Sequence, residues 1–237
     1  MLVHGFTQTA RSWRPIADDL SRDHEIVGVD LPGHGDSGDE RGDLWATADQ
    51  VADAGGLAVY VGYSLGGRVC LHVAIRHPEQ VRGLILIGAT GGLETSSARA
   101  DRRASDERLA AGIEAHGVDP FLDSWLAQPL FSRLKVDDAA LADRKRNTPA
   151  GLAASLRDAG TGTQEPLWDQ LGSIRVPALV MAGEHDVKFR QAAARLCDVM
   201  RPYAQQSVVP GAGHAPHLEQ PTATLGLMRQ WLRNNRW

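Results

Sequence analysis

A serine flanked by glycines follows a short apolar run in the first third of the chain. The run Leu57–Val61 has the composition of a buried strand, and the residues after the pentapeptide G-Y-S-L-G at 62–66 carry apolar side chains at helical spacing. This is the G-x-S-x-G pattern of a nucleophile elbow, a sharp strand-to-helix turn that exposes the serine hydroxyl. The glycines let the backbone make the turn without a Cβ clash. We therefore expect Ser64 to be the reactive side chain of an enzyme.

A serine hydroxyl needs a histidine to activate it, and the histidine needs a carboxylate to orient it. In enzymes with this elbow, the acid and then the histidine follow the serine along the chain. Two later apolar runs have such residues just beyond their ends: Asp186 follows Ala178–Met181, and His214 follows Ser207–Val209. Both would lie on the rim of the sheet that carries Ser64. We predict Ser64, Asp186 and His214 as a catalytic triad.

Several other residues compete for these roles. Glu184 is an alternative acid, but its position close to the strand end leaves it less free to reach over the site. His185 neighbours the acid and should point elsewhere. His217 is expected in the first turn of the final helix as a surface or packing residue. His4 is expected to be structural, bonding to local backbone, and His34 is a weak catalytic candidate in a glycine-rich loop.

Two backbone N–H groups are expected to form an oxyanion hole. The amide of Leu65 comes directly after the nucleophile and lies at a helix N-terminus. The second donor should come from the turn after the first strand, where the amide of Phe6 is the best candidate. Together they can stabilise an oxygen on which negative charge develops.

Strand-like apolar runs alternate with helical segments, which predicts an α/β fold with a mostly parallel sheet flanked by helices. The first run, Met1–Val3, is only a stub. Either that strand is very short or the natural chain starts earlier, and we favour the second reading. The other expected strands are Ile26–Val29, Leu57–Val61, Leu84–Ile87, Ala178–Met181 and Ser207–Val209. The expected helices are Ser12–Leu20, Leu44–Ala54, Ser64–His77, Phe189–Met200 and Pro221–Leu232.

The alternation stops between residues 91 and 168, where helical segments are separated by prolines. Helices inserted between two strands would cover the carboxyl ends of the strands, where ligands bind in open α/β sheets. The alternative is an insert without a ligand role. We expect a core of residues 1–90 and 169–237 and a helical cap of residues 91–168. Its helices are expected at Ser97–His116, Phe121–Leu126, Asp137–Asn147 and Pro149–Ala159.

Composition narrows the class of protein. A chain of 237 residues with 43% hydrophobic residues fits one domain with a sizeable core. Its net charge of −4 argues against nucleic acid or an acidic membrane surface as a partner. No apolar run reaches the roughly 18 residues of a spanning helix, and we expect no signal peptide. Cys70 and Cys197 are too few for a disulfide framework, so a cytoplasmic location is expected.

No cofactor and no metal are expected. The histidines and aspartates lack the spacing of metal ligands such as H-x-x-x-H with a nearby third ligand. No phosphate loop or dinucleotide fingerprint follows a strand. The chemistry is therefore expected to rest on side chains and backbone amides alone.

The assembled pattern resembles the α/β-hydrolase superfamily over nearly the whole chain. A closer resemblance is carried by His4-Gly5-Phe6-Thr7, Tyr63-Ser64-Leu65-Gly66-Gly67-Arg68, Arg102 with Ser105-Asp106, Trp125 before Gln128-Pro129-Leu130-Phe131, Arg144 before Asn147 and Gly151-Leu152-Ala153, Gly183-Glu184-His185-Asp186 with Lys188-Phe189, and Gly213-His214 with His217. On these residues, the chain resembles most the 2-succinyl-6-hydroxy-2,4-cyclohexadiene-1-carboxylate (SHCHC) synthases of menaquinone biosynthesis. One departure is that the residues preceding the His-Gly turn in that family have almost no counterpart here.

The resemblance implies a lyase. Such an enzyme eliminates pyruvate from 2-succinyl-5-enolpyruvyl-6-hydroxy-3-cyclohexene-1-carboxylate to give SHCHC, and the triad serine acts as a base. The substrate bears three carboxylates, which suits the paired planar donors of guanidinium groups. Arg68 lies one helical turn after Ser64 and so shares its face of the helix. The substrate-binding residues that the resemblance implies are Tyr63, Arg68, Arg102, Trp125 and Arg144.

The arginines of the expected cap have alternatives. Arg103 and Arg146 replace Arg102 and Arg144 if the helix phase is shifted by one residue. Residues 91–168 contain ten Arg or Lys and twelve Asp or Glu, so this segment is not basic overall. Only convergence of particular arginines on Ser64 would therefore indicate a site for a polyanion.

Two other functions remain open. A carboxylic ester or carbon–carbon bond hydrolase would use the same triad, with water completing the reaction, and an apolar pocket would favour it. A non-enzymatic receptor would lack a triad member, and none is missing from the sequence. For the enzyme we expect a small-molecule polycarboxylate substrate, no nucleic-acid or membrane partner, and a monomer or weak homo-oligomer.

Overall fold

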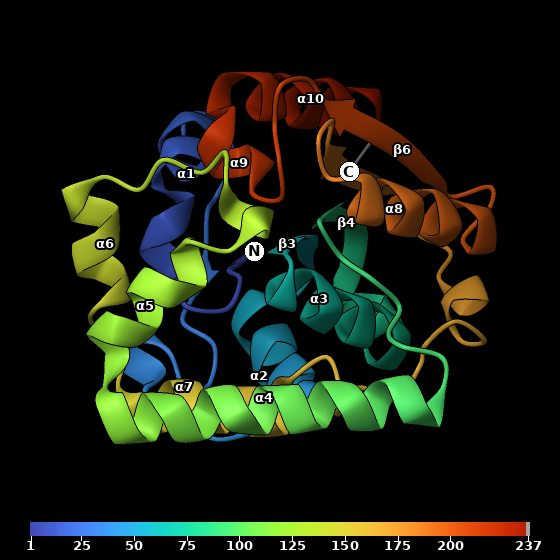
Figure 1. Ribbon diagram of the computed structural model, residues 1–237. Helices are drawn as coiled ribbons and strands as arrows, with labels where there is room; N and C mark the ends of the chain where they lie inside the picture. The colour runs from blue at the N-terminus through green and yellow to red at the C-terminus, as the bar shows by residue number, and fades with distance from the viewer. Residues whose placement is uncertain (236–237) are drawn as a thin grey trace.

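The computed structural model describes residues 1–235, which form one six-stranded sheet in the order β2-β1-β3-β4-β5-β6 (Figure 1). All five strand pairings are parallel. A parallel sheet flanked by helices confirms the fold class predicted from the sequence. The strands are β1 (Leu2–Val3), β2 (Gly28–Val29), β3 (Ala58–Tyr63), β4 (Val81–Ile87), β5 (Ala178–Gly183) and β6 (Ala204–Val209).

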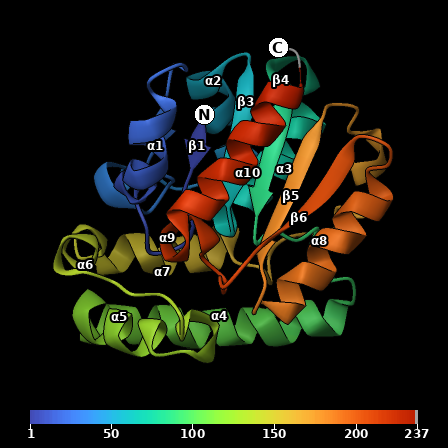
Figure 2. The ribbon, with the colours of Figure 1, turned by 90° about the horizontal axis from the view of Figure 1, so that it is seen from above.

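Helices cover both faces of the sheet because the central strands bury side chains in both directions. In β4, Leu84 and Leu86 pack into one apolar cluster, while Ile85 and Ile87 pack into the other. Figure 2 shows α10 on one side of the sheet and α3 on the other. The face that buries Ile85 and Ile87 is covered by α1 (Arg14–Leu20) and α10 (Pro221–Asn234). The face that buries Leu84 and Leu86 is covered by α2 (Leu44–Gly55), α3 (Leu65–Arg76) and α8 (Val187–Val199).

Within the described residues, the connection from β4 to β5 contains helices and loops but no strand. Its helices lie together along the side of the molecule that Figure 2 shows at the bottom, and they share a third apolar cluster that includes Ile113, Leu122 and Leu152. A threonine caps each of the two longest helices: Thr95 accepts from the Ala98 amide at 3.2 Å, and Thr148 accepts from the Gly151 amide at 3.0 Å. The helices are α4 (Ser96–His116), α5 (Val118–Leu126), α6 (Asp138–Arg144) and α7 (Pro149–Ala159).

A 3₁₀ turn and a short helix lie just before the two helices that cover one face of the sheet. A 3₁₀ turn, Ala10–Trp13, precedes α1, and a short helix, α9 (Pro216–Glu219), precedes α10. His217 therefore lies in α9 rather than in the first turn of the final helix. Within residues 1–235, no helix is long and apolar enough to cross a membrane.

Candidate active site

Ser64 stands at a strained turn between β3 and α3. Its φ of 51° lies in the left-handed region that residues other than glycine rarely adopt. The Ser64 amide donates to the carbonyl of Ile87 in the neighbouring strand at 2.8 Å, which fixes the turn to the sheet. A Cβ at Gly62 would collide with the backbone of Gly66, and one at Gly66 would collide with the Val3 carbonyl. The two glycines therefore allow the close packing that exposes the serine.

Asp186 and His214 meet just beyond the ends of β5 and β6. The carboxylate Oδ2 of Asp186 accepts a hydrogen bond from Nδ1 of His214 at 2.7 Å, and both side chains are buried. Asp186 is also the N-cap of α8, since its Oδ1 accepts from the Phe189 amide at 3.2 Å. Because Nδ1 is engaged by the carboxylate, Nε2 is the imidazole nitrogen that remains for a hydroxyl.

A cavity of about 200 Å³ lies over Ser64, between the strand ends and the helices that follow β4. Asp186 does not line the cavity; it acts on the site through its hydrogen bond to His214, which does. Lys188, whose sequence position predicts no role, also lines the cavity. Most of the side chains singled out from the sequence line the same cavity, namely Phe6, Tyr63, Ser64, Leu65, Arg68, Arg102, Trp125, Arg144 and His214.

The competing residues are engaged elsewhere. Glu184 accepts from the Gly211 amide at 2.8 Å and is exposed, and His185 is exposed beside it. Arg103 donates to the Gly162 carbonyl at 2.8 Å, and Arg146 pairs with the carboxylates of Asp36 and Asp143. None of these four side chains lines the cavity.

His4 and His34 are structural, as both are fully buried and engage backbone groups. His4 Nδ1 donates to the Gly5 carbonyl at 2.8 Å, and its Nε2 accepts from the Leu31 amide at 2.9 Å. His34 Nε2 accepts from the Thr7 amide at 3.3 Å. Burial lowers the pKa of His4 to about 4 and that of His34 to about 3, so both rings are neutral in the folded protein.

His217 is buried between two aromatic rings. Its ring centroid lies 4.6 Å from that of Trp13 and 4.4 Å from that of Tyr63. Within residues 1–235, neither ring nitrogen of His217 has a hydrogen-bond partner. Burial lowers its pKa to about 3, and the nearby charge of Arg144 contributes. The side chain therefore acts as a neutral packing group.

These three neutral histidines predict a loss of stability in mild acid. The unfolded chain takes up protons below its ordinary histidine pKa of 6.5, whereas the folded protein does not. Each ring therefore removes about 1.4 kcal/mol from the free energy of unfolding per pH unit as the pH falls from 6.5 toward its folded pKa. We expect His217→Phe to reduce this slope by the contribution of one ring, about 1.4 kcal/mol per pH unit. The variant should still fold, because phenylalanine keeps the aromatic packing.

Urea unfolding near neutral pH and at about pH 5 measures this slope. The exposed His116 at the end of α4 offers a matched control, and His116→Gln should leave the slope unchanged. An equal slope in the wild type and in His217→Phe would show that His217 is not held neutral by burial.

Three guanidinium groups approach the cavity with different partners. Arg68 and Arg144 are buried, and within residues 1–235 neither forms an ion pair with a carboxylate. Arg68 donates to the side-chain oxygen of Gln164 at 3.3 Å, and Arg144 donates to the hydroxyl of Thr7. Arg102 is more exposed and pairs with Asp106 at 2.7 Å. Among the described residues, the cavity thus holds two buried cations that are not in ion-pair contact with a carboxylate, although the charges of Asp106 and Asp143 act on Arg68 and Arg144 from farther away.

Burial affects the titration of the groups that face the cavity. It lowers the pKa of Arg68 to about 9, with a contribution from the charge of Arg102, so Arg68 is still charged at neutral pH. Burial likewise lowers the pKa of Arg144. Burial raises the pKa of Tyr63, so its hydroxyl keeps its proton and can donate it in a hydrogen bond. An anion in the cavity would offset the desolvation of both arginines.

The two candidate oxyanion donors border the same space. Phe6 lies in the turn after β1, and Leu65 is the first residue of α3. Within the described part of the chain, neither amide donates to a protein acceptor, so both are available to a ligand. Two convergent amides beside a serine can stabilise an oxyanion or an enolate oxygen.

Comparisons with known proteins agree with this architecture. The model of the alpha/beta hydrolase family matches residues 1–226. A 2-succinyl-6-hydroxy-2,4-cyclohexadiene-1-carboxylate synthase of Enterobacter sp. (strain 638) is 34% identical over 243 residues, which cover 98% of this chain and 91% of that protein.

Two solved structures are also similar. The structure of MenH from S. aureus has a TM-score of 0.90 at 28% identity, and covers 98% of this chain and 92% of that one. A malate-bound thermophilic esterase from Thermogutta terrifontis has a TM-score of 0.80 at 25% identity, and covers 98% of this chain and 88% of that one. The chain therefore belongs to the alpha/beta hydrolase family, and within it to the group of 2-succinyl-6-hydroxy-2,4-cyclohexadiene-1-carboxylate synthase relatives.

Proposed function

We propose that this enzyme eliminates pyruvate from 2-succinyl-5-enolpyruvyl-6-hydroxy-3-cyclohexene-1-carboxylate to give SHCHC. The observation that carries the proposal is the pair of buried guanidinium groups, Arg68 and Arg144, which line the cavity over Ser64. A buried cation without a counter-ion is unfavourable unless a ligand supplies the opposite charge. A substrate with three carboxylates supplies it, whereas a neutral ester does not.

The site supports a proton abstraction followed by elimination. Ser64 Oγ takes the proton from ring carbon 2, next to the succinyl ketone, and passes its own proton to Nε2 of His214. The electron pair forms a double bond between carbons 2 and 3, the existing double bond moves to carbons 4 and 5, and the bond from carbon 5 to the enolpyruvyl oxygen breaks. The departing enolate takes up one proton, equivalent to the one that His214 gained, and becomes pyruvate, so that His214 returns to its neutral form. Asp186 stabilises the His214 imidazolium through their 2.7 Å hydrogen bond.

The remaining residues have binding roles in this proposal. The Phe6 and Leu65 amides hold the ketone oxygen as it gains negative charge. Arg68, Arg102 and Arg144 bind carboxylates. Lys188 adds a fourth cation on the wall of the cavity. Tyr63 and Trp125 form parts of the wall, and in this proposal the Tyr63 hydroxyl donates a hydrogen bond to the substrate.

Residues 91–168 are proposed to act as a cap over a core of residues 1–90 and 169–237. Support comes from the separate apolar cluster of α4, α5 and α7 and from the cavity wall, to which these helices contribute Arg102, Trp125 and Ser155. In this arrangement the core supplies the triad and the cap supplies part of the anion site. We also propose that the enzyme works in the cytoplasm, as a monomer or weak homo-oligomer.

Pyruvate release tests the proposed reaction directly. The substrate is generated in place by the enzyme that precedes this step, and the spontaneous rate without enzyme is subtracted. We expect rapid pyruvate release and only feeble cleavage of a p-nitrophenyl ester. Fast ester cleavage without pyruvate release would instead assign the chain to the ester hydrolases, as the similarity to the Thermogutta terrifontis esterase allows.

A further inference from the structure

The turn that carries Phe6 is held in a disfavoured conformation. The Gln8 amide donates to the Gly5 carbonyl at 3.1 Å, which closes a β-turn over Phe6 and Thr7. Thr7 has a φ of 68°, and a positive φ at this third position of a turn is usually provided by glycine. For a β-branched residue such a φ is an outlier, so something outside the turn must impose it.

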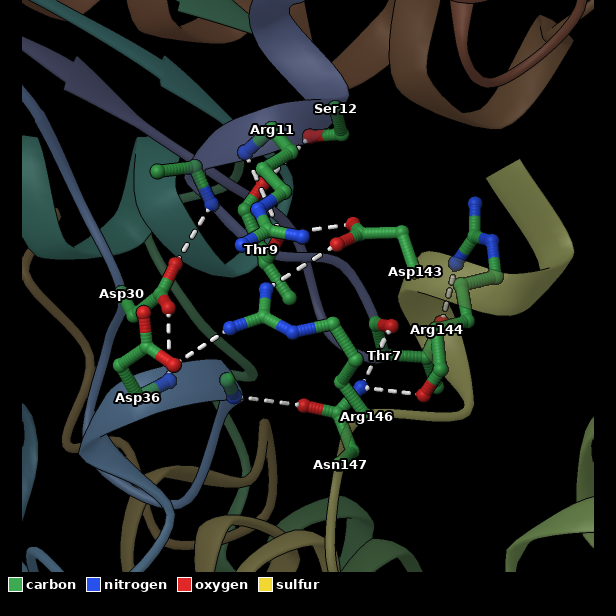
Figure 3. Close-up of polar contacts among 12 residues, drawn as sticks. Thr7, Thr9, Arg11, Ser12, Asp30, Asp36, Asp143, Arg144, Arg146 and Asn147 are labelled. Atoms are coloured by element: carbon green, nitrogen blue, oxygen red, sulfur yellow. Dashed lines mark hydrogen bonds and ion pairs between the residues drawn. The ribbon is translucent and has the colours of Figure 1, made fainter. Parts of the chain in front are cut away.

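Three side chains from other segments bind the polar groups of Thr7. The Thr7 amide donates to His34 Nε2 at 3.3 Å, and the Thr7 carbonyl accepts from Asn147 Nδ2 at 2.9 Å. The Thr7 hydroxyl accepts from Arg144. Two of the three partners come from the end of α6 and the link that follows it, which lie beside Thr7 in Figure 3. The conformation of the turn therefore depends on residues that are distant in the sequence.

Asn147 makes the most connections in this arrangement. It is 4% exposed, and its Nδ2 donates to the carbonyl of Thr7 and also to that of Arg144, at 2.8 Å. Its Oδ1 accepts from the Gly35 amide at 2.9 Å. One amide side chain thus joins the turn, the end of α6 and the loop after β2 (Figure 3). Asn147 does not line the cavity, so it acts only through these neighbours.

We propose that Asn147 is a positioning residue that holds the Gly5–Gln8 turn so that the Phe6 amide is aimed at the oxyanion. This inference rests on the oxyanion role given to Phe6 under the proposed function, which elimination and ester hydrolysis share. An oxyanion donor is effective only within a few tenths of an ångström of its position. A turn that relaxes out of its strained conformation moves that donor away.

The same contacts join ligand binding to the oxyanion hole. Arg144 lines the cavity, and it bonds to the Thr7 hydroxyl through its guanidinium and to Asn147 through its main-chain carbonyl. A carboxylate bound at Arg144 therefore lies next to a group that fixes the turn. Binding and transition-state stabilisation are coupled through a single short path.

Asn147→Ala tests the proposal, because it removes all three hydrogen bonds and leaves room for water to satisfy the backbone groups. Complete loss of one oxyanion donor lowers kcat by about 10²–10³-fold. Because a displaced donor retains part of its effect, we expect kcat to fall by at least about tenfold. KM should stay within about threefold. The rate at which a fluorophosphonate labels Ser64 should fall in parallel with kcat.

A second substitution separates positioning from general damage. Glycine adopts a positive φ without penalty. Adding Thr7→Gly to Asn147→Ala should therefore raise kcat at least about threefold above that of Asn147→Ala alone. Should Asn147→Ala fail to fold, Asn147→Ser, whose hydroxyl can replace one donation, takes its place with an expected loss of about threefold in kcat. A merely structural role of Asn147 gives no such recovery.

Thr148→Ala is the matched control, because it removes the N-cap of α7 next to Asn147 without touching the turn. It should lower stability and leave kcat within about twofold. The proposal fails if folded Asn147→Ala keeps its kcat and labelling rate within about twofold, or if Thr148→Ala loses as much. If the wild type releases no pyruvate, the proposed elimination fails, but ester turnover and fluorophosphonate labelling still decide the role of Asn147.

Discussion

Replacing Ser64 with alanine should abolish turnover, with kcat reduced by at least about 10³-fold. In the proposed mechanism, the change removes the group that accepts the substrate proton and leaves His214 without a hydroxyl to activate. The fold should survive, because the Ser64 amide keeps its bond to the Ile87 carbonyl and, among residues 1–235, the Ser64 side chain makes no capping hydrogen bond to the turn. Pyruvate release and a thermal or urea unfolding curve of the same preparation measure both effects.

His214→Ala should lower kcat as much as Ser64→Ala does, because the proposed proton transfer needs both the serine hydroxyl and the histidine. Glu184→Gln is a suitable control: the exposed side chain bonds to the Gly211 amide outside the cavity, and activity should stay within about twofold of the wild type. Full activity in Ser64→Ala would remove the triad from the mechanism and leave the cavity without an evident base.

Replacing Arg68 with methionine should lower kcat/KM for the tricarboxylate substrate by about 10²–10³-fold. Two charge-assisted hydrogen bonds to a carboxylate contribute about 3–4 kcal/mol, and each 1.36 kcal/mol corresponds to a factor of ten. Turnover of a neutral p-nitrophenyl ester should change by less than about threefold. Folding should not suffer, because methionine is of comparable length and the variant no longer buries a cation without a counter-ion.

The ratio of the two substrates is the informative measurement, because it cancels any general damage to the triad. Arg82 lies exposed in β4, far along the strand from the site, so Arg82→Met removes the same charge without touching the cavity. Equal losses of both substrates in Arg68→Met would show that Arg68 supports the elbow rather than the substrate, and would remove the main argument for a polyanionic ligand.

Most of the fold could be predicted because its signals are local. The glycine spacing of the elbow and the helical periodicity of α3 and α4 lie within a few turns of chain, and the predicted Ser97–His116 helix begins one residue late. Two predicted strands are too short because polar residues hide their starts. β6 starts at Ala204 rather than Ser207, since its first residues include exposed glutamines on an edge strand. β4 starts at Val81 rather than Leu84, since Arg82 interrupts the apolar run.

The finer parts of the site depend on contacts that no local pattern contains. The predicted helix to Asn147 ends instead at Arg144, where the Asn147 side chain bonds to the Arg144 carbonyl and leaves the following residues outside the helix. The strain at Thr7 and the pairing of Arg68 with Gln164 join residues far apart in the sequence. Periodicity and spacing identify which elements form, but they do not identify such partners.

The long helical connection between β4 and β5 also determines when activity can appear during folding. Leu84 pairs with Ala178, so this pairing closes a loop of about 90 residues, and such non-local pairings form slowly. Ser64 lies on one side of that loop, and Asp186 and His214 lie on the other. Both apolar clusters of the sheet contain residues from each side of this loop, so they too are completed only when the loop closes. Local helices can form earlier, but until the loop closes the serine has no base and the chain has no catalytic site.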